Sequence, residues 1–485
     1  MASKSPFGAS EFVKGVQSGS ISVLEHTSKI CDEIEKKNRK FWHFNFFDSE
    51  NALGQAQVLE KEIKRGRNGK LLGIPLSAKD CLCVKGMESR AGSKILSGYV
   101  PPFDAAAVEK CRKEGAIILG KTSQDEFGFG TFSVNHTAET IMGGKNLGVK
   151  IPLNPLDSER SCGGSSGGAA GFAALTENTH VALAESTGGS IACPASFCGA
   201  ASITPTYGLV SRYGLMDYAN SLDKIGAIGK SIPDVRLLLD VIAGRDARDS
   251  TSLESSGIAL QDLKKIKIGV PKELMAEIEN EKVKDAVLKK ISSAEELGIE
   301  TVEVSMPLNA KYGIEVYYLI AMAEASTNLA KYCGMRYGYS KKLEGNFNEY
   351  FSAVRSEAFG EEAKRRILLG TFARMSGFRA AYYLRAMKVR TKLISEFKSV
   401  FSKADLLAYP AMPMVAPKFR EIEKLSPLEH YAADLCTVPP NVCGMPHATV
   451  NAGEVGGMPV GLMVVGNHLE DSKVLSLAAE LEGLK

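Results

Sequence analysis

The sequence predicts a single large α/β domain, in which a mixed β-sheet is covered by helices on both faces. Three observations predict it. Strand-like and helix-like segments alternate from about residue 72 to about residue 235, a strand, helix and strand pattern follows from about residue 266, and two more strand-like runs lie near the C-terminus. Such alternation is typical of a sheet with helices on both sides. The length of 485 residues alone would also allow two or three domains.

Residues 1–65 are expected to form a helical N-terminal lead-in packed on the core. Two stretches, SVLEHTSKICDEIEKKN and SENALGQAQVLEKEIKRG, place apolar side chains at helical spacing, and the second ends at Gly66 after a basic last turn. Residues 66–485 are expected to form the domain itself, with its core at about 70–235.

The first strands of the core are predicted by short apolar runs. LGIPLSAKD, starting at Leu72, is expected to be a strand that ends in polar residues, and residues 104–114 are expected to be a helix that stops at Gly115. The run AIIL then predicts a buried strand. The polar stretch at 244–257 is interpreted as a surface loop, because strand-like sequence continues after it.

The second half of the chain is expected to complete the same sheet. KIKIGVP, a helix over 279–297 and IETVEVSMP give another strand, helix and strand, and residues 315–403 are expected to be mostly helical. LLAYPAMP and GLMVVG are predicted to be the closing strands.

Bulk composition restricts the classes of function. With 59 basic and 56 acidic residues the net charge is +3, so the chain has no overall field that would hold a polyanion by charge alone. The N-terminus lacks the apolar core of a signal peptide, and no run of about 18 to 20 apolar residues is present, which together predict a cytoplasmic protein. The ten cysteines show no paired C-x-x-C spacing, so reduced thiols and no structural metal are expected.

Residues 115–122 match the phosphate-binding pattern G-x-x-x-x-G-K-[ST] but do not predict a nucleotide site. Such a loop needs a strand before its first glycine and a helix that begins at the lysine. Here a helix precedes Gly115, and the four residues between the glycines are apolar and β-prone. Gly115 is therefore interpreted as a helix stop and AIIL as a core strand.

Two serine-bearing glycine clusters carry the strongest chemical signal. CGGSSGGAAGFAA and ESTGGSIACPASFCGAASITPTYGLVSRYGL lie within residues 162–215, and Ser165 and Ser190 stand 25 residues apart. Glycines beside a serine permit tight backbone turns and leave neighbouring N–H groups unobstructed, as an oxyanion hole requires. Flexible turns are the simpler interpretation of such clusters.

A nucleophilic serine needs a base within hydrogen-bond reach, directly or through a relay. None of the seven histidines lies in a glycine and serine context, so a Ser-His-Asp triad is not indicated. Lys79 ends the strand LGIPLSAK, where apolar neighbours can desolvate its ammonium and favour the neutral base. A solvated surface lysine is the simpler alternative.

These motifs resemble the amidase-signature family, and the resemblance runs from about residue 70 to the C-terminus. It implies the amidase-signature fold and a Ser-cis-Ser-Lys triad formed by Lys79, Ser165 and Ser190, with a cis peptide bond before Ser165. Ser166 is the competing choice for the cis serine, because the segment between the clusters is one residue longer than is usual in the family.

The resemblance also implies an oxyanion hole, made of the main-chain N–H groups of Thr187, Gly188, Gly189 and Ser190. Two positions depart from the family pattern. The family usually has an aspartate where Ser186 stands and an arginine where Ala192 stands. These departures put the bracing of the nucleophile loop in question.

Within the family the sequence is most similar to the glutamine-hydrolysing members of aspartyl/glutamyl-tRNA amidotransferases. The similar segments include GKTSQDEFGFG, PTYGLVSRYGL, SLDKIG, RRILLGTFA, AYYLRAMKVRTKL and YAADLCTVPPN. This implies a glutaminase that passes ammonia to a B subunit, within a heterotrimer that also contains a C subunit. No cofactor is implied in this chain, whereas ATP and Mg²⁺ are implied on the partner, which would also hold most of the tRNA.

A glutaminase must bind the carboxylate and the ammonium of a free amino acid, for which arginine and a carboxylate are suited. The resemblance puts these roles on Arg366 and Asp434, with Arg365 as the competing arginine. Tyr317 or Tyr318 is expected to line the pocket. Two other functions stay open: a stand-alone amidase acting on another small or acyl amide, and a non-catalytic scaffold subunit.

Overall fold

The computed structural model describes residues 7–263 and 266–484. Within these residues a thirteen-stranded mixed sheet has the order β10-β9-β11-β13-β12-β7-β8-β6-β2-β3-β1-β4-β5. In chain order the strands are β1 (Phe44–Phe47), β2 (Pro75–Lys79), β3 (Ile117–Thr122), β4 (Glu139–Met142), β5 (Lys145–Val149), β6 (Val181–Ser186), β7 (Ala201–Thr204), β8 (Lys224–Gly229), β9 (Lys267–Pro271), β10 (Glu300–Val304), β11 (Leu406–Pro410), β12 (His447–Val455) and β13 (Met458–Val465). The predicted single α/β fold with one mixed sheet is confirmed.

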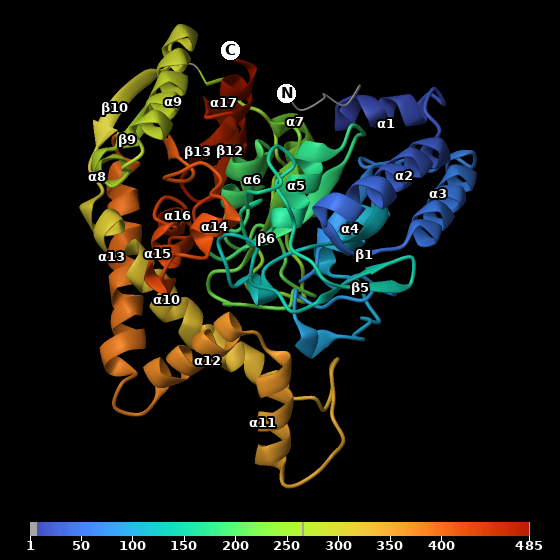
Figure 1. Ribbon diagram of the computed structural model, residues 1–485. Helices are drawn as coiled ribbons and strands as arrows, with labels where there is room; N and C mark the ends of the chain where they lie inside the picture. The colour runs from blue at the N-terminus through green and yellow to red at the C-terminus, as the bar shows by residue number, and fades with distance from the viewer. Residues whose placement is uncertain (1–6, 264–265, 485) are drawn as a thin grey trace.

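Helices surround this sheet (Figure 1). The α-helices are α1 (Ala9–Gln17), α2 (Val23–Phe41), α3 (Ser49–Ile63), α4 (Ala106–Lys113), α5 (Gly167–Leu175), α6 (Ala192–Cys198), α7 (Ile232–Ile242), α8 (Lys272–Ala276), α9 (Glu281–Ser292), α10 (Pro307–Asn328), α11 (Phe347–Ala358), α12 (Glu361–Arg374), α13 (Arg385–Val400), α14 (Phe419–Ile422), α15 (Pro427–Ala432), α16 (Val438–Val442) and α17 (Asp471–Gly483). Short turns η1 (Lys94–Leu96), η2 (Glu126–Gly128), η3 (Ser293–Leu297), η4 (Leu329–Lys331) and η5 (Ala380–Leu384) complete the regular structure.

Alternate residues of β6 face opposite layers of helices. Ala182 and Ala184 pack in a cluster of small side chains with residues of α5. Val181 and Leu183 belong instead to the main core, which also contains the apolar face of α7. Because successive strand residues point to opposite faces, helices cover both sides of the sheet at β6. The small residues of α5 let that helix lie close to the strands that carry the site.

Several predicted elements lie where the sequence indicated. The strand from Leu72 is β2, the helix before Gly115 is α4, and AIIL lies in β3. Gly115 has a φ of +88°, which suits a glycine after a helix end. The strand β3 continues through Lys121 to Thr122, so no helix begins at the lysine of the phosphate-binding pattern, and its buried side chain donates to the Ser89 hydroxyl at 3.0 Å.

Four strands were not predicted. β1 lies inside the region expected to be purely helical and pairs with β3. It was missed because the four residues Phe44–Phe47 are too few to show a period. β4 and β5 form a hairpin at the end of the sheet around Gly143 and Gly144, both with positive φ. β12 is buried in its first half and exposed in its second, so neither pattern runs through it.

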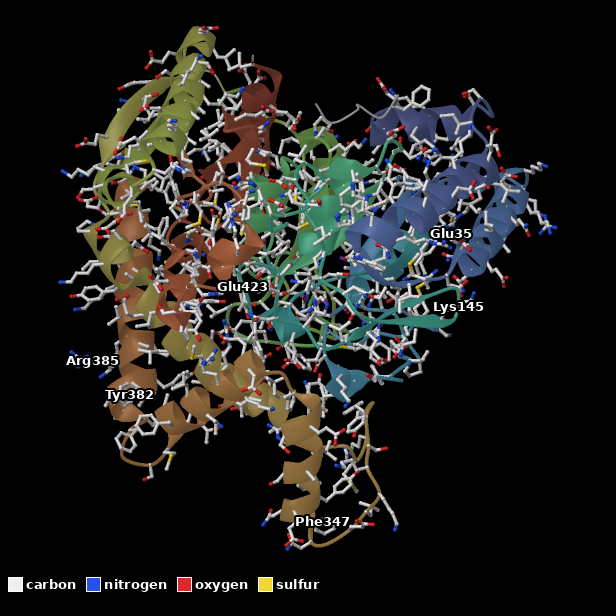
Figure 2. The ribbon with its side chains drawn as sticks, in the orientation of Figure 1. Glu35, Lys145, Phe347, Tyr382, Arg385 and Glu423 are labelled. Atoms are coloured by element: carbon white, nitrogen blue, oxygen red, sulfur yellow. The ribbon has the colours of Figure 1, made fainter. Side chains whose placement is uncertain are left out.

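The helices α10, α12 and α13 pack together at one side of the sheet, and α11 projects from the body of the molecule (Figure 1). Figure 2 shows Phe347 near the tip of α11 and Tyr382 and Arg385 near the lower end of α13. Among the described residues no helix is both long and apolar enough to cross a membrane. All ten cysteines are free thiols; nine are buried and Cys333 is half-buried.

Candidate active site

Lys79 is the last residue of β2 and is fully buried. β2 pairs in parallel with β6, with Ala78 opposite Leu183, so the carboxyl ends of both strands meet at one edge of the sheet. Lys79 Nζ lies 2.7 Å from Ser165 Oγ, 2.9 Å from the main-chain oxygen of Glu185 and 2.8 Å from Glu185 Oε2. The lysine therefore meets the first glycine-serine cluster from the end of a strand.

The residue before Ser165, Gly164, lies where the surrounding backbone leaves no room for a side chain. The peptide bond between Gly164 and Ser165 is cis. A Cβ at Gly164 would lie 2.8 Å from the main-chain nitrogen of Ser133 and 2.9 Å from the main-chain oxygen of Gly130. The Gly164 N–H donates to the main-chain oxygen of Thr131 at 2.7 Å. Ser165, rather than Ser166, is thus the residue whose hydroxyl reaches Lys79.

Ser190 lies in the loop between β6 and α6, next to the first cluster. Its main-chain oxygen accepts from the Ser166 N–H at 3.2 Å, which ties the two loops together. Ser166 Oγ in turn donates to the main-chain oxygen of Glu185 at 3.2 Å. Ser190 is 6% exposed, whereas Lys79, Ser165 and Ser166 are fully buried. Of these four residues, Ser190 is therefore the one with side-chain or main-chain surface open to solvent.

The loop before Ser190 presents unused donors. The main-chain N–H groups of Thr187, Gly188, Gly189 and Ser190 donate to no acceptor in the part of the chain that the structure describes. The carbonyls of the two glycines are engaged, since Asn441 Nδ2 donates to the oxygen of Gly188 and the Cys193 N–H donates to that of Gly189 at 2.8 Å. A group of free donors beside a serine can stabilise an oxyanion.

Tyr317 covers this loop. A Cβ at Gly188 would lie 2.8 Å from Cζ and from Oη of Tyr317, and a Cβ at Gly189 would lie 3.0 Å from Cβ of Thr437. Both glycines are thus needed for close contact with α10 and with the segment before α16. Tyr317 lies against the loop, while Tyr318 points to Asp434.

Asp434 is buried and accepts from Tyr318 Oη at 2.9 Å and from Thr131 Oγ1 at 3.1 Å. Burial raises the pKa of Asp434 to about 6, although the hydrogen bonds from Tyr318 and Thr131 oppose the rise. The main-chain oxygen of Thr131 also accepts the Gly164 N–H. Thr131 therefore connects Asp434 to the backbone just before Ser165. A carboxylate here can bind a cation that enters from the adjoining pocket.

Arg366 extends from α12 into a ring of aromatic side chains. Its Nε lies 2.8 Å from Glu362 Oε1, and its Nη1 donates to Tyr218 Oη at 2.5 Å. Nη2 has no hydrogen-bond partner among the described residues. The guanidinium carbon lies 5.1 to 5.6 Å from the ring centres of Phe129, Tyr218, Tyr318 and Tyr431. This ring fixes the guanidinium while leaving one nitrogen for an anion.

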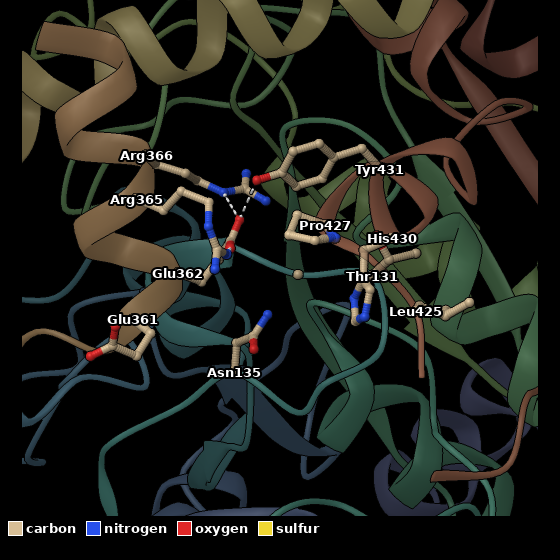
Figure 3. Close-up of a pocket in the computed structure, with 11 residues that line it drawn as sticks. Thr131, Asn135, Glu361, Glu362, Arg365, Arg366, Leu425, Pro427, His430 and Tyr431 are labelled. Carbon is tan, nitrogen blue, oxygen red and sulfur yellow. Dashed lines mark hydrogen bonds and ion pairs between the residues drawn. The ribbon is translucent and has the colours of Figure 1, made fainter. Parts of the chain in front are cut away.

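A pocket of about 330 Å³ opens beside Arg366 (Figure 3). It is lined by Gly130, Thr131, Asn135, Glu361, Glu362, Arg365, Arg366, Leu425, Pro427, His430 and Tyr431. Figure 3 shows Glu362 between Arg366 and Tyr431, whose hydroxyl donates to Glu362 Oε1 at 2.9 Å. Arg365 also pairs with Glu362 but is exposed, so Arg366 is the arginine that lies inside the site.

Glu185 and Asp223 are the residues at this site that sequence reasoning missed. Glu185 Oε1 accepts from Thr187 Oγ1 at 2.8 Å, and Thr187 Oγ1 also lies 2.9 Å from Asp223 Oδ1. Burial first, and the charge of Glu185 second, raise the pKa of Asp223 well above its ordinary value. The available signal was an acidic residue at the end of the otherwise apolar strand VALAES.

The two departures from the expected pattern lie within the same loops. Ser186 is buried, and its hydroxyl has no hydrogen-bond partner among the described residues. Ala192 is buried at the start of α6. A carboxylate is nevertheless present one residue earlier than Ser186, as Glu185.

Comparison with known proteins gives concordant matches. The family described as amidase matches residues 25–475. The A subunit of glutamyl-tRNA(Gln) amidotransferase from Methanosarcina mazei is 45% identical over 466 residues, which cover 95% of this chain and 93% of the relative. The protein of the same name from Thermoanaerobacter pseudethanolicus is 40% identical over 467 residues, covering 95% and 93%.

Solved structures give the same picture. The crystal structure of the A subunit of glutamyl-tRNA(Gln) amidotransferase from Thermotoga maritima has a TM-score of 0.74 at 32% identity, and the match covers 94% of this chain and 90% of that one. The peptide amidase from Stenotrophomonas maltophilia has a TM-score of 0.79 at 26% identity, covering 98% and 96%.

Proposed function

This chain belongs to the amidase family, and from that premise we propose that it is the glutaminase component of a tRNA-dependent amidotransferase. It hydrolyses glutamine to glutamate and ammonia. The observation that carries the proposal is the 2.7 Å contact between Lys79 Nζ and Ser165 Oγ, beside a loop whose free N–H groups flank Ser190. The 45% identity to the Methanosarcina mazei protein over 95% of the chain supports the choice of reaction.

In the proposed reaction Ser190 Oγ attacks the side-chain amide carbon of glutamine. Its proton passes through Ser165 Oγ to the neutral amine of Lys79, and the N–H groups of residues 187–190 stabilise the oxyanion. The C–N bond then breaks, the leaving nitrogen takes the proton back by the same route, and ammonia departs. Water, activated in the same way, hydrolyses the ester on Ser190 and releases glutamate.

Arg366 and Asp434 are proposed to bind the two charged ends of glutamine. The free Nη2 of Arg366 is available to the α-carboxylate, and the Asp434 carboxylate is available to the α-ammonium. Tyr317 is proposed to line the pocket, since it lies against Gly188. Arg365 is paired with Glu362 at the outer rim, which favours Arg366 for the inner role.

We assign the second half of the reaction to partner subunits. A B subunit would use the ammonia, with ATP and Mg²⁺, to amidate Glu-tRNA(Gln) or Asp-tRNA(Asn) or both, and a C subunit would complete a heterotrimer in the cytosol. The relatives' names describe them as one component of an amidotransferase, which supports an assembly. The net charge of +3 supports binding of tRNA mainly through the partner.

The test is ammonia release from glutamine by the purified chain, with and without the B and C subunits. We expect turnover in the assembled complex and its loss in Ser190→Ala, with Ser186→Ala as a control that removes a neighbouring buried hydroxyl. Rapid hydrolysis of unrelated amides by the chain alone would instead support a stand-alone amidase. Failure of a fluorophosphonate to label Ser190 in the complex would support a non-catalytic scaffold.

A further inference from the structure

Two of the three acceptors around Lys79 Nζ belong to Glu185. The main-chain oxygen of Glu185 lies 2.9 Å away and its Oε2 lies 2.8 Å away, while Ser165 Oγ lies 2.7 Å away. We propose that Glu185 is a positioning residue that aims the Lys79 nitrogen at Ser165. The inference rests on the proposed function, in which Lys79 is the base.

The aiming follows from the directions of the N–H bonds and the lone pair on an amine nitrogen. A neutral lysine has two N–H bonds and one lone pair, in roughly tetrahedral directions. If both N–H groups donate to Glu185, once to its main-chain oxygen and once to its carboxylate, the lone pair is left facing Ser165 Oγ. The same two contacts serve the ammonium form, which then donates its third hydrogen to Ser165.

The Glu185 carboxylate is itself held in place. Thr187 Oγ1 lies 2.8 Å from Glu185 Oε1 and 2.9 Å from Asp223 Oδ1. One hydroxyl hydrogen forms one linear hydrogen bond, so the geometry fits a protonated Asp223 that donates to Thr187, which donates to Glu185. Asp223 Oδ2 accepts the N–H groups of Tyr218 and Ala219, each at 3.0 Å.

Both members of this contact are shielded from water. Lys79 and Glu185 are 0% and 4% exposed at their side chains. A carboxylate makes a stronger hydrogen bond than a neutral acceptor, and solvent is excluded from competing for this one. Glu185 therefore holds the Lys79 nitrogen in one position.

Other titratable groups face this cluster. Cys81, two residues beyond Lys79, and Asp125, in the loop after β3, interact with the charge of Lys79. Burial raises the pKa of Asp125 to about 6. Asp217 and Tyr207 interact with the charge of Asp223. Of the titratable groups around Lys79 in the described part of the chain, Glu185 alone makes a side-chain hydrogen bond to Lys79 Nζ. Substitution of Glu185 therefore tests this one contact.

The experiment measures how fast a fluorophosphonate labels Ser190 between pH 5.5 and 10, using the full chain assembled with its partner subunits. Labelling needs an activated serine but not glutamine binding. The variants are Glu185→Gln, which keeps an oxygen acceptor for Lys79, and Glu185→Ala, which removes it. Asp234→Asn is the matched control, because Asp234 in α7 is a buried carboxyl that accepts the Ala9 N–H at 2.7 Å and makes none of the contacts described for this site.

For Glu185→Gln we expect a labelling rate within about tenfold of the wild type, because the amide oxygen still accepts a hydrogen bond from Lys79. For Glu185→Ala we expect the rate to fall by more than about tenfold across this pH range, because the lone pair is no longer aimed. Asp234→Asn should keep the wild-type rate. Thermal unfolding of each variant separates these effects from misfolding.

A labelling rate in Glu185→Gln as low as that in Glu185→Ala, or a wild-type rate in Glu185→Ala, would overturn the inference. Labelling that follows the expected pattern in a complex that does not hydrolyse glutamine would refute the proposed substrate and leave the role of Glu185 standing. A wild-type Ser190 that is never labelled would overturn both.

Discussion

Lys79 and Glu185 form an ion pair that is almost entirely shielded from water. Removing one member of such a pair leaves the other charge buried and uncompensated, which typically costs about 3 to 5 kcal/mol. The catalytic and the structural contributions of Lys79 are therefore expected to separate in a double variant.

We predict that Lys79→Met lowers glutamine turnover by at least about a hundredfold and also lowers the unfolding temperature. Adding Glu185→Gln to Lys79→Met should restore most of the stability but none of the turnover, because the charge is removed while the base is still absent. Ammonia release and calorimetry are the two measurements. Turnover near the wild-type value in Lys79→Met would mean that another group is the base.

A second prediction concerns Asp434, whose pKa burial raises to about 6. Above this pH the carboxylate is charged and can bind the ammonium of glutamine; as the pH falls through about 6 it takes up a proton and the attraction is lost. The KM for glutamine should therefore rise below pH 6, with a smaller change in kcat. Asp434→Asn should raise KM above about pH 6, where the wild-type carboxylate is charged, and abolish this dependence. A KM that still rises at acid pH in the variant would assign the effect to another group.

At this scale the sequence located some of the candidate residues and missed others. Lys79 was recognisable as a lysine at a strand end and Ser165 as part of a glycine-serine cluster, but their pairing was implied only by the resemblance to the amidase-signature family. Glu185 was overlooked because it precedes the glycine-rich loop and belongs to an apolar strand. Asp223 reaches the site only because β8 pairs antiparallel with β6, placing Ser186 opposite Lys224, and no local spacing encodes that pairing.

The helix α12 carries Arg366 and crosses α10 at Gly370. A Cβ at Gly370 would meet the main-chain oxygen of Met322 and lie 3.0 Å from the main-chain nitrogen of Ala323. Both atoms belong to the backbone of α10 and cannot rotate away. The approach of the two helices, and with it the position of Arg366 one turn earlier, depends on this glycine.

We predict that Gly370→Ala forces α12 away from α10, raises the KM for glutamine by about tenfold and lowers stability by about 1 to 3 kcal/mol. Gly54→Ala is the matched control, since Gly54 also lies inside a helix, α3, and a Cβ there would meet nothing within 4 Å. The control should gain up to about 1 kcal/mol from helix propensity. Kinetics and thermal unfolding test both, and an unchanged KM in Gly370→Ala would show that the helices adjust without moving Arg366.

Elements with a strong apolar period or a clear end signal were predictable, as β2, α4 and β3 illustrate. β4 and β5 were not, because β4 is mostly half-buried and β5 mostly exposed, so neither strand shows an alternation of buried and exposed residues. β1 was hidden between two helices by its brevity: four residues cannot display a period.

The sheet joins distant parts of the chain. β8 precedes the polar stretch at 244–257 and β9 follows it, yet both lie in one sheet through β11, β13, β12 and β7. The division into a lead-in at 1–65 and a domain at 66–485 remains a prediction, and the family match begins at residue 25, within α2. Strand order itself could not be predicted, because it depends on long-range pairing such as that of β12 with β7.

We predict a single cooperative unfolding transition, with equal calorimetric and van't Hoff enthalpies, for the described part of the chain. Cleavage of the loop within residues 249–257 should leave the two pieces associated in gel filtration, because shared strands hold them together. Two separated transitions, or the release of a folded fragment, would indicate independent domains.

The single half-buried thiol has a practical consequence. Cys333 lies between α10 and α11, whereas the other nine cysteines are enclosed by the fold. A maleimide dye added to the native protein should therefore attach at one point, outside the catalytic loops. That attachment gives fluorescence or spin-label measurements a fixed reporter on the segment that leads into α11, without any cysteine having to be engineered out.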